Sequence, residues 1–208
     1  MDVKKAIEER RTIRRFIPDQ PVSDEAIMEI LEAARLAPSG SNLQPWRFVV
    51  VRDEEMRKKI AAIAGNQPFL KEAPVIIVCC GDLRALKDRP RAIRELVNLG
   101  ALERVPSGVI DEIIKMGEQI YGTELHIRGI VSNCYISIAF MVLQAMELGL
   151  GTAWIGFFDQ DRLKALLEIP SEEAVVASLL AVGYANEHPR PRPRKNLGEI
   201  VFQEKWRR

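Results

Sequence analysis

Apolar residues recur every three or four positions in several stretches of the chain, and this pattern predicts amphipathic helices. Asp2 and Ser23 each precede such a stretch and can cap the N-terminus of a helix. The apolar positions are Val3, Ala6 and Ile7 in the first helix and Ile27, Ile30, Leu31 and Ala34 in the second. Further helices are predicted after the capping residues Asp53 and Asp159, ending near Gly65 and Leu167, and from Ser107 towards Tyr121.

Shorter runs of β-branched and other apolar residues predict strands at 47–51, 74–80, 152–156 and 174–184. The run 74–80 shows no polar alternation, so we expect it to lie at the centre of a sheet and to be buried on both faces. Helices and strands alternate along the chain, and neither an internal repeat nor a linker interrupts residues 1–208. The pattern therefore predicts a single domain in which helices cover a sheet.

Residues 129–150 form the longest apolar stretch and predict a long helix. The stretch also contains polar residues, namely Ser132, Asn133, Ser137, Gln144 and Glu147. Because a membrane span would be more uniformly apolar, we expect this helix to be buried in the core or at a subunit interface. The basic N-terminal segment is not followed by the apolar run of a secretory signal, so we expect a cytoplasmic protein that does not bind membranes.

The overall charge is nearly balanced, with 30 Lys and Arg residues, 29 Asp and Glu residues and a net charge of +1. This balance argues against nucleic acid or an anionic membrane as a partner. Cys79, Cys80 and Cys134 lie in apolar surroundings and are odd in number, so we expect buried free thiols. His126 and His188 are far apart in the sequence, and no cysteine pair has ligand spacing, so no metal site is expected.

The chain lacks the motifs of common nucleotide-binding and nucleophilic sites. There is no GxGxxG after a strand, no Walker lysine and no GxSxG. If the protein is an enzyme, its reactive centre is therefore expected to come from a cofactor. We expect no side chain to act as a catalytic acid, base or nucleophile.

Two basic clusters are candidates for binding an anion, because guanidinium groups match phosphate in shape and charge. The first comprises Arg10, Arg11, Arg14 and Arg15, together with the hydroxyl of Thr12. The second lies in a proline-rich tail and comprises Arg190, Arg192 and Arg194. Alternate residues of an extended chain point the same way, so Arg192 and Arg194 could reach one anion together. For either cluster alone, a solvated surface is the simpler interpretation.

The segment 38–46, with the sequence PSGSNLQPW, concentrates polar groups in a predicted loop. Its hydroxyl and amide side chains are Ser39, Ser41, Asn42 and Gln44. Gly40 allows the backbone to approach a ligand closely. A turn does not require so many polar groups beside Trp46, whereas a planar heterocycle with several carbonyl groups and ring nitrogens does. Gly65–Asn66, by contrast, is equally well explained as the end of a helix.

Five segments in order resemble the nitroreductase family of FMN proteins: RRTIRRF, APSGSNLQPWRFVVV, GNQPFLKEAPVIIV, the long helix ending in ELGLGTAWIG, and RPRKNLGEIV. The resemblance covers most of the chain and is weakest at residues 83–125. It implies an α+β, three-layer fold with a central mixed or antiparallel sheet and helices on both faces. It also implies a lid or insert at 83–125 and an intertwined homodimer, in which residues 186–208 form a swapped arm around the partner.

The same resemblance implies that FMN lies between two subunits. The residues it places at FMN are Arg10, Arg11, Thr12, Arg14, Asn66, Trp154, Ile155, Gly156, Arg192 and Arg194. It implies that Pro38, Ser39, Gly40 and Asn42, in the loop that also holds Gln44, come from the other subunit. Thr12 stands where Ser is usual, and Ile155 stands where several members carry Glu. Neither arginine cluster is persuasive alone, so the FMN prediction depends on the dimer prediction.

The function implied is that of an FMN-dependent oxidoreductase. NAD(P)H would deliver a hydride to flavin N5, and a small acceptor such as a nitroaromatic, a quinone or an enone would then receive it in a ping-pong cycle. Alternatives within the family are a reductive dehalogenase and a protein that consumes its own flavin. A non-catalytic flavin-binding protein is a further alternative. A basic-tailed nucleic-acid or scaffold protein would be colourless when purified, whereas an FMN protein is yellow.

Overall fold

Four strands form one sheet within residues 2–206, the part of the chain that this computed structural model describes. They are β1 (Trp46–Val51), β2 (Val75–Asp82), β3 (Gly151–Ile155) and β4 (Ala174–Gly183). Neighbouring strands pair antiparallel in the order β1-β2-β4-β3. A parallel bridge from Thr12 to Thr152 extends the sheet beyond β3. The predicted mixed or antiparallel sheet is therefore confirmed.

The α-helices are α1 (Val3–Glu9), α2 (Asp24–Arg35), α3 (Glu54–Ile63), α4 (Pro68–Glu72), α5 (Arg89–Asn98), α6 (Ser107–Ile120), α7 (Glu124–Glu147), α8 (Gln160–Leu166) and α9 (Leu197–Ile200). Two 3-10 helices, η1 (Gly40–Asn42) and η2 (Leu83–Asp88), complete the helical elements. The predicted capping side chains each accept a backbone N–H from the first turn of their helix: Asp2, Ser23, Asp53 and Asp159. Each cap satisfies a backbone donor that the helix itself leaves free.

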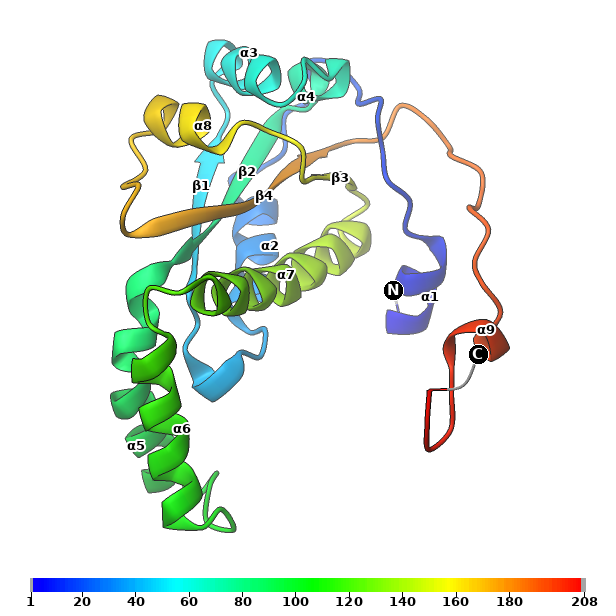
Figure 1. Ribbon diagram of the computed structural model, residues 1–208. Coiled ribbons are helices and arrows are strands. Elements are labelled where there is room, and N and C mark those ends of the chain that lie inside the picture. Colours follow the sequence, from blue (N-terminus) through cyan, green and yellow to red (C-terminus); the bar gives the residue numbers. More distant parts are fainter. Residues whose placement is uncertain (1, 207–208) are drawn as a thin grey trace.

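The sheet lies between two layers of helices. Successive residues of a strand point to opposite faces of the sheet, so each strand supplies side chains to both layers. On β2, Ile77 and Cys79 pack towards α2 and α7, whereas Ile76 and Val78 pack towards α3, α4 and α8. Figure 1 shows α7 crossing one face of the sheet and α3, α4 and α8 grouped on the other. All eight residues of β2 are buried, as expected for a central strand. The predicted three-layer arrangement is confirmed.

Helix α7 begins at Glu124, five residues before the predicted start, and is the longest helix in the described chain. Ile138 and Met141 are fully buried against the sheet, so the prediction of a core helix is confirmed. By length and composition alone the same helix would also suit a membrane span. In this fold it packs against α2, β2 and β4, as a helix on the core of a globular domain does. The predicted role at a subunit interface is not tested by a single chain.

The segment between α1 and α2 runs closely over the β3 and β4 edge of the sheet. Ile13 donates its backbone N–H to the carbonyl of Thr152 at 2.9 Å. A Cβ atom at Gly151 would lie 2.6 Å from the Ile13 side chain, and one at Gly183 would lie 2.9 Å from Phe16. The two glycines therefore permit this close approach. The approach places the preceding arginine segment next to β3.

Residues 83–125 contain two helices, α5 and α6, that project from the body as a pair (Figure 1). The helix predicted from Ser107 is confirmed as α6, but α5 and η2 were not predicted. Pro90 looked like an interruption in the sequence. It instead occupies the first turn of α5, where a missing N–H costs nothing.

The first and last described helices, α1 and α9, leave apolar side chains exposed. Ala6 is the buried residue of α1, whereas Val3 and Ile7, two of its predicted apolar positions, are 69% and 58% exposed. The C-terminal tail leaves the sheet after β4 and runs back to place α9 on the same side as α1 (Figure 1). Leu197 and Ile200 of α9 are also exposed. Both termini therefore carry apolar side chains that the single chain does not cover.

Candidate functional site

The predicted binding residue Arg10 lies beside Thr12 and Trp154 at the outer edge of β3. These three residues line a cavity of about 410 Å³, and α7 forms the opposite wall with Ala139, Val142 and Leu143. Tyr135 of α7 stands edge-on to Trp154, with the ring centroids 5.4 Å apart. The side chain of Trp154 is 40% exposed, so its ring is accessible to a ligand. The structure thus brings three of the predicted residues to one place.

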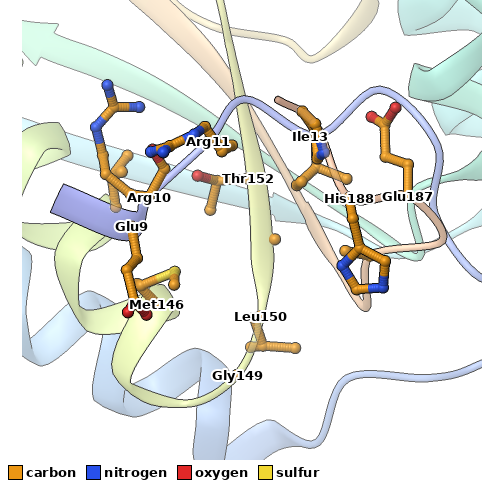
Figure 2. A pocket seen from close by; sticks show the side chains of 14 residues that line it. Glu9, Arg10, Arg11, Ile13, Met146, Gly149, Leu150, Thr152, Glu187 and His188 are labelled. Atoms are coloured by element: carbon orange, nitrogen blue, oxygen red, sulfur yellow. The ribbon is translucent and has the colours of Figure 1, made fainter. Parts of the chain in front are cut away.

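A second cavity of 380 Å³ adjoins this edge and is lined by residues from both the N-terminal segment and the C-terminal tail. Figure 2 shows Arg10 and Arg11 on one side of it and Glu187 and His188 of the tail on the other. The guanidinium of Arg11 donates to the carbonyls of Glu8 and Arg10 at 2.7 and 2.8 Å. These bonds hold the guanidinium against its own backbone, with its positive charge unneutralised.

The predicted arginines lack acidic partners. Within residues 2–206, none of the five forms a salt bridge: Arg10, Arg11, Arg14, Arg192 and Arg194. Other arginines of the chain do pair, for example Arg47 with Asp82 at 3.1 Å. Of these five, Arg10 and Arg11 line the cavities, and guanidinium groups without acidic partners fit the phosphate of a nucleotide-like ligand. The residues present are therefore compatible with the phosphate end of FMN.

Glu187 connects the tail to the N-terminal arginine segment. Its carboxylate accepts the backbone N–H groups of Arg14 and Arg15, the latter at 3.1 Å. Asn186 donates its backbone N–H to the carbonyl of Arg15 at 2.9 Å, which reinforces the connection. Arg192 and Arg194, further along the tail, are exposed, and Arg194 donates to the carbonyl of Pro193. The start of the tail is therefore fixed beside the arginine segment, while Arg192 and Arg194 have no acidic partner among the described residues.

The loop at residues 38–44 has an unusual backbone. Ser41, Asn42 and Gln44 all have positive φ angles, of 53°, 53° and 47°. For residues other than glycine this conformation costs energy, and such strain tends to gather at functional sites. The hydroxyl of Ser39 closes the loop by accepting the backbone N–H of Gln44 at 2.9 Å. Gly40 donates its backbone N–H to Oδ1 of Asn133 on α7 at 2.8 Å.

The face of this loop opposite the sheet contacts the α5–α6 pair and encloses a cavity of 510 Å³. The loop contributes Pro38, Ser39, Ser41 and Asn42 to the lining, and the helical pair with its connecting segment contributes Ile93, Leu96, Leu102, Val105, Ile110 and Ile113. The cavity thus has a polar side and an apolar side. None of the described residues that line it is charged.

The loop and the Arg10 cavity lie at different places along α7. Asn133 holds the loop, whereas the wall facing Arg10 extends from Ala139 to Leu143. At a rise of 1.5 Å per residue, this separation amounts to about 9–15 Å along the helix. One chain therefore does not direct the loop and Arg10 into the same cavity. This is the arrangement expected if the loop serves a site on another subunit.

The remaining predicted residues cluster beside α3. Gly65 and Asn66 form a left-handed turn with φ angles of 73° and 54°. A Cβ atom at Gly65 would lie 3.2 Å from the ring of Phe157, so the turn is adjacent to the segment that follows Ile155 and Gly156. Asn66 and Gly156 are exposed, which leaves the Asn66 amide and the Gly156 backbone available to a ligand.

The cysteines and histidines give no sign of a metal site or of nucleophilic chemistry. No group of metal-ligating side chains occurs among the described residues. Burial raises the pKa of Cys80 to about 11 and that of Cys134 to about 12, so both remain protonated thiols. The cysteines are free and buried, as predicted.

Sequence reasoning missed two residues of this region, Asn133 and Glu187. Asn133 gave a weak signal, because it is a polar side chain in a largely apolar helix. Glu187 gave none, because its partners lie 172 and 173 residues away in the sequence. Contacts over such distances depend on the fold and not on a local pattern.

Comparison with known proteins agrees with this geometry. A model of the nitroreductase family matches residues 7–184. An NADH dehydrogenase of Thermus thermophilus is 35% identical over 207 residues, a match that covers 100% of this chain and 97% of the relative. An NAD(P)H-dependent FMN reductase of Bacillus subtilis is 30% identical, covering 99% of this chain and 74% of the relative.

Solved structures show the same similarity. A nitroreductase-like protein of Exiguobacterium sibiricum, solved in complex with FMN, superposes with a TM-score of 0.80 at 26% sequence identity. The superposition covers 100% of this chain and 98% of that protein. The likeness therefore includes the α5–α6 pair and the C-terminal tail as well as the sheet.

Proposed function

Because this chain belongs to the nitroreductase family, we propose that it is an FMN-dependent oxidoreductase that takes a hydride from NAD(P)H and passes it to a small organic acceptor. When bound, FMN would supply the redox chemistry by accepting the hydride at N5 and releasing it to the acceptor in a ping-pong cycle. The observation that carries the proposal is that Arg10 and Arg11, which have no acidic partner in the described part of the chain, line the two adjoining cavities at the outer edge of β3.

In this proposal the phosphate and ribityl end of FMN is held by residues from both ends of the chain. Arg10, Arg11, Thr12 and Arg14 would act with Arg192 and Arg194. Guanidinium groups bind phosphate through paired hydrogen bonds, and positive charge near the pyrimidine edge of the ring would stabilise negative charge there. The hydrogen bond from the Arg15 N–H to the Glu187 carboxylate supports this assignment, because it holds the start of the tail beside the arginine segment at residues 10–15.

The ring end of FMN is assigned to exposed polar and backbone groups. Asn66 would hydrogen-bond to the ring, Ile155 and Gly156 would present backbone near N5, and Trp154 would pack beside it. The loop with Pro38, Ser39, Gly40, Asn42 and Gln44 would reach the flavin of the partner subunit. The separation of that loop from Arg10 along α7 supports a site shared between two chains.

A homodimer also accounts for apolar surface that the single chain leaves exposed. Ile136 and Phe140 of α7 are each 40% exposed, although Ile138 and Met141 on the same helix are fully buried. Val3 of α1 and Leu197 of α9 are 69% and 74% exposed at the two ends of the chain. Exposed apolar surface of this extent is typical of a protein–protein interface. We assign it to a partner copy whose arm, predicted as residues 186–208, wraps around the first; residues 207 and 208 lie outside the described part of the chain.

The 510 Å³ cavity beside the loop favours neutral acceptors. A zwitterionic amino acid, as a dehalogenase of the iodotyrosine type would bind, needs charged partners when it leaves water. No charged side chain lines this cavity within the described residues. Quinones, nitroaromatics and enones carry no such requirement. We therefore assign residues 83–125 as a lid that selects for apolar, uncharged acceptors.

The proposal is tested with the purified protein. A yellow sample with flavin absorbance, which oxidises NADH or NADPH in steady state with menadione as acceptor, is the expected result. Parallel lines in double-reciprocal plots would identify the ping-pong cycle. A colourless monomer that takes up no FMN would overturn the proposal. Bound flavin that neither nucleotide reduces would instead favour the non-catalytic flavin-binding protein.

A further inference from the structure

Asn133 joins the long helix α7 to the polar loop through its side-chain amide. Its Oδ1 accepts the backbone N–H of Gly40 at 2.8 Å, and its Nδ2 donates to the carbonyl of Gly129 at 2.7 Å. The second bond lies within one turn of the helix. It fixes the orientation of the amide, so that the oxygen faces the loop and the nitrogen does not.

The loop that Asn133 contacts needs such an anchor. Three of its residues, Ser41, Asn42 and Gln44, hold the left-handed conformation, which a free chain of L-residues rarely adopts. The hydroxyl of Ser39 closes the loop on itself but does not attach it to the body. The Gly40–Asn133 bond does attach it, at the first residue of η1.

The side chain of Asn133 is not explained by packing. Its helical neighbours Ile130 and Cys134 are buried in an apolar cluster, and asparagine favours helices less than leucine does. A leucine at position 133 would therefore suit the helix better than asparagine does. What it would lose is the acceptor for the Gly40 N–H.

We propose that Asn133 is a positioning residue for cofactor binding: it holds the 39–44 loop in the strained shape in which Ser39, Gly40 and Asn42 meet the flavin. The inference rests on the proposed function, because that function assigns the loop to FMN. Asn133 acts through Gly40 and does not itself touch the cofactor. Without this anchor the loop relaxes, and part of the energy of FMN binding is used to restore it.

Three variants at position 133 separate this role from a general effect on folding. Asn133→Leu keeps the size of the side chain and removes the acceptor. Asn133→Ala is the second loss variant, in case leucine prevents folding. Asn133→Asp keeps the acceptor for Gly40 and gives up only the bond to Gly129. Ser132→Ala is the matched control, because its hydroxyl bonds to the carbonyl of Arg128 within the helix and not to the loop.

The experiment measures the FMN dissociation constant of each apo-protein by flavin fluorescence, together with the thermal midpoint of the apo form. We expect the dissociation constants of Asn133→Leu and Asn133→Ala to rise about tenfold, because a hydrogen bond that orders the loop is lost. Asn133→Asp and Ser132→Ala should stay close to wild type. A merely structural role would lower the midpoint without this rescue by aspartate.

The failure of this inference is distinct from that of the proposed function. Wild-type protein that binds no FMN would refute the proposed function. Wild-type protein that binds FMN, with Asn133→Leu and Asn133→Ala binding equally well, would refute only the positioning role. The role would also be refuted if Asn133→Asp bound as weakly as Asn133→Leu, or if loss of folded apo-protein accounted for the whole change in affinity.

Discussion

The carboxylate of Glu187 accepts the backbone N–H of Arg15 at 3.1 Å, across 172 residues of sequence. It also accepts the N–H of Arg14, so one side chain satisfies two donors of the arginine segment. The bond ties the start of the C-terminal tail to the residues assigned to the FMN phosphate. An acidic residue therefore organises a basic site through the backbone, and leaves the guanidinium groups free.

Removing this carboxylate should loosen the arginine segment. We expect Glu187→Ala to weaken FMN binding by roughly tenfold, since hydrogen bonds to a charged group contribute about 1.5–3 kcal/mol. Glu187→Gln retains an acceptor and should lose less. Fluorescence titration of the apo-proteins measures the effect. Equal FMN affinity in the alanine variant and in wild type would show that the hydrogen bonds to Glu187 do not contribute to cofactor binding.

The arginines of the tail provide a second test. Arg192→Ala and Arg194→Ala should each weaken FMN binding by about tenfold, because each removes a charge-assisted bond to phosphate. The affinity should also depend less on salt than in wild type. Arg190→Ala is the matched control, with the same charge change in the same tail. If all three variants behaved alike, the effect would be one of overall charge and not of two specific contacts.

The dimer prediction is tested on α7. Phe140→Arg places a charge on the side of the helix assigned to the interface, and burial of a phenylalanine contributes about 1.5–3 kcal/mol per copy. Sedimentation should show a dimer for wild type and a shift to monomer for this variant, with loss of bound FMN. Met28→Arg, at a 64% exposed position of α2, is the control. A Phe140→Arg variant that stays dimeric and yellow would contradict the assigned interface.

Much of the fold could be predicted from the sequence because its determinants are local. The capping side chains Asp2, Ser23, Asp53 and Asp159 mark helix starts, and the continuous apolar run of β2 identifies a central strand. Helix α5 was missed because Pro90 at a helix start looks the same in a sequence as Pro at a break. Whether a proline begins a helix or breaks one depends on how the residues on either side of it pack in the fold.

The residue types of the candidate site could be predicted from the sequence, but the hydrogen bonds and ion pairs between them could not. Arginines and the polar loop are visible as local clusters, but their free or paired state depends on which carboxylates the fold brings near. Arg47 pairs with Asp82 although nothing in the sequence sets it apart from Arg10, which has no such partner in the described chain. Asn133 and Glu187 act over long sequence distances, so no local pattern could reveal their partners.

His126, at the start of α7 next to the α5–α6 pair, should make the stability of the protein depend on pH. Burial lowers the pKa of His126, and the positive charge of Arg89 acts in the same direction. The folded protein therefore disfavours the protonated ring, so this stability is present above the ordinary pKa of about 6.5 and is lost as the pH falls below it. His126→Asn keeps an acceptor for the Gly122 N–H that Nδ1 accepts at 3.1 Å.

The thermal midpoint should therefore fall less between pH 8 and pH 5 in His126→Asn than in wild type. For a chain of this size, each 1 kcal/mol of stability shifts the midpoint by roughly 2–4 °C. His188→Asn, at an exposed position of the tail, serves as the control and should follow wild type. Identical pH dependence in all three proteins would show that His126 does not contribute.

Acceptor selection is tested at the apolar wall of the 510 Å³ cavity. Ile110→Lys introduces a positive charge there, so the KM for neutral menadione should rise while that for an anionic quinone sulfonate falls. Roughly tenfold changes are expected, because an unpaired charge is costly beside an apolar ligand and is stabilised by an anionic one. Val109→Lys is the matched control, since Val109 precedes Ile110 on α6 but does not line the cavity. Both variants should retain FMN and reduce it with NAD(P)H at the wild-type rate. If Ile110→Lys left the ratio of the two KM values unchanged, this cavity would not be where the acceptor binds.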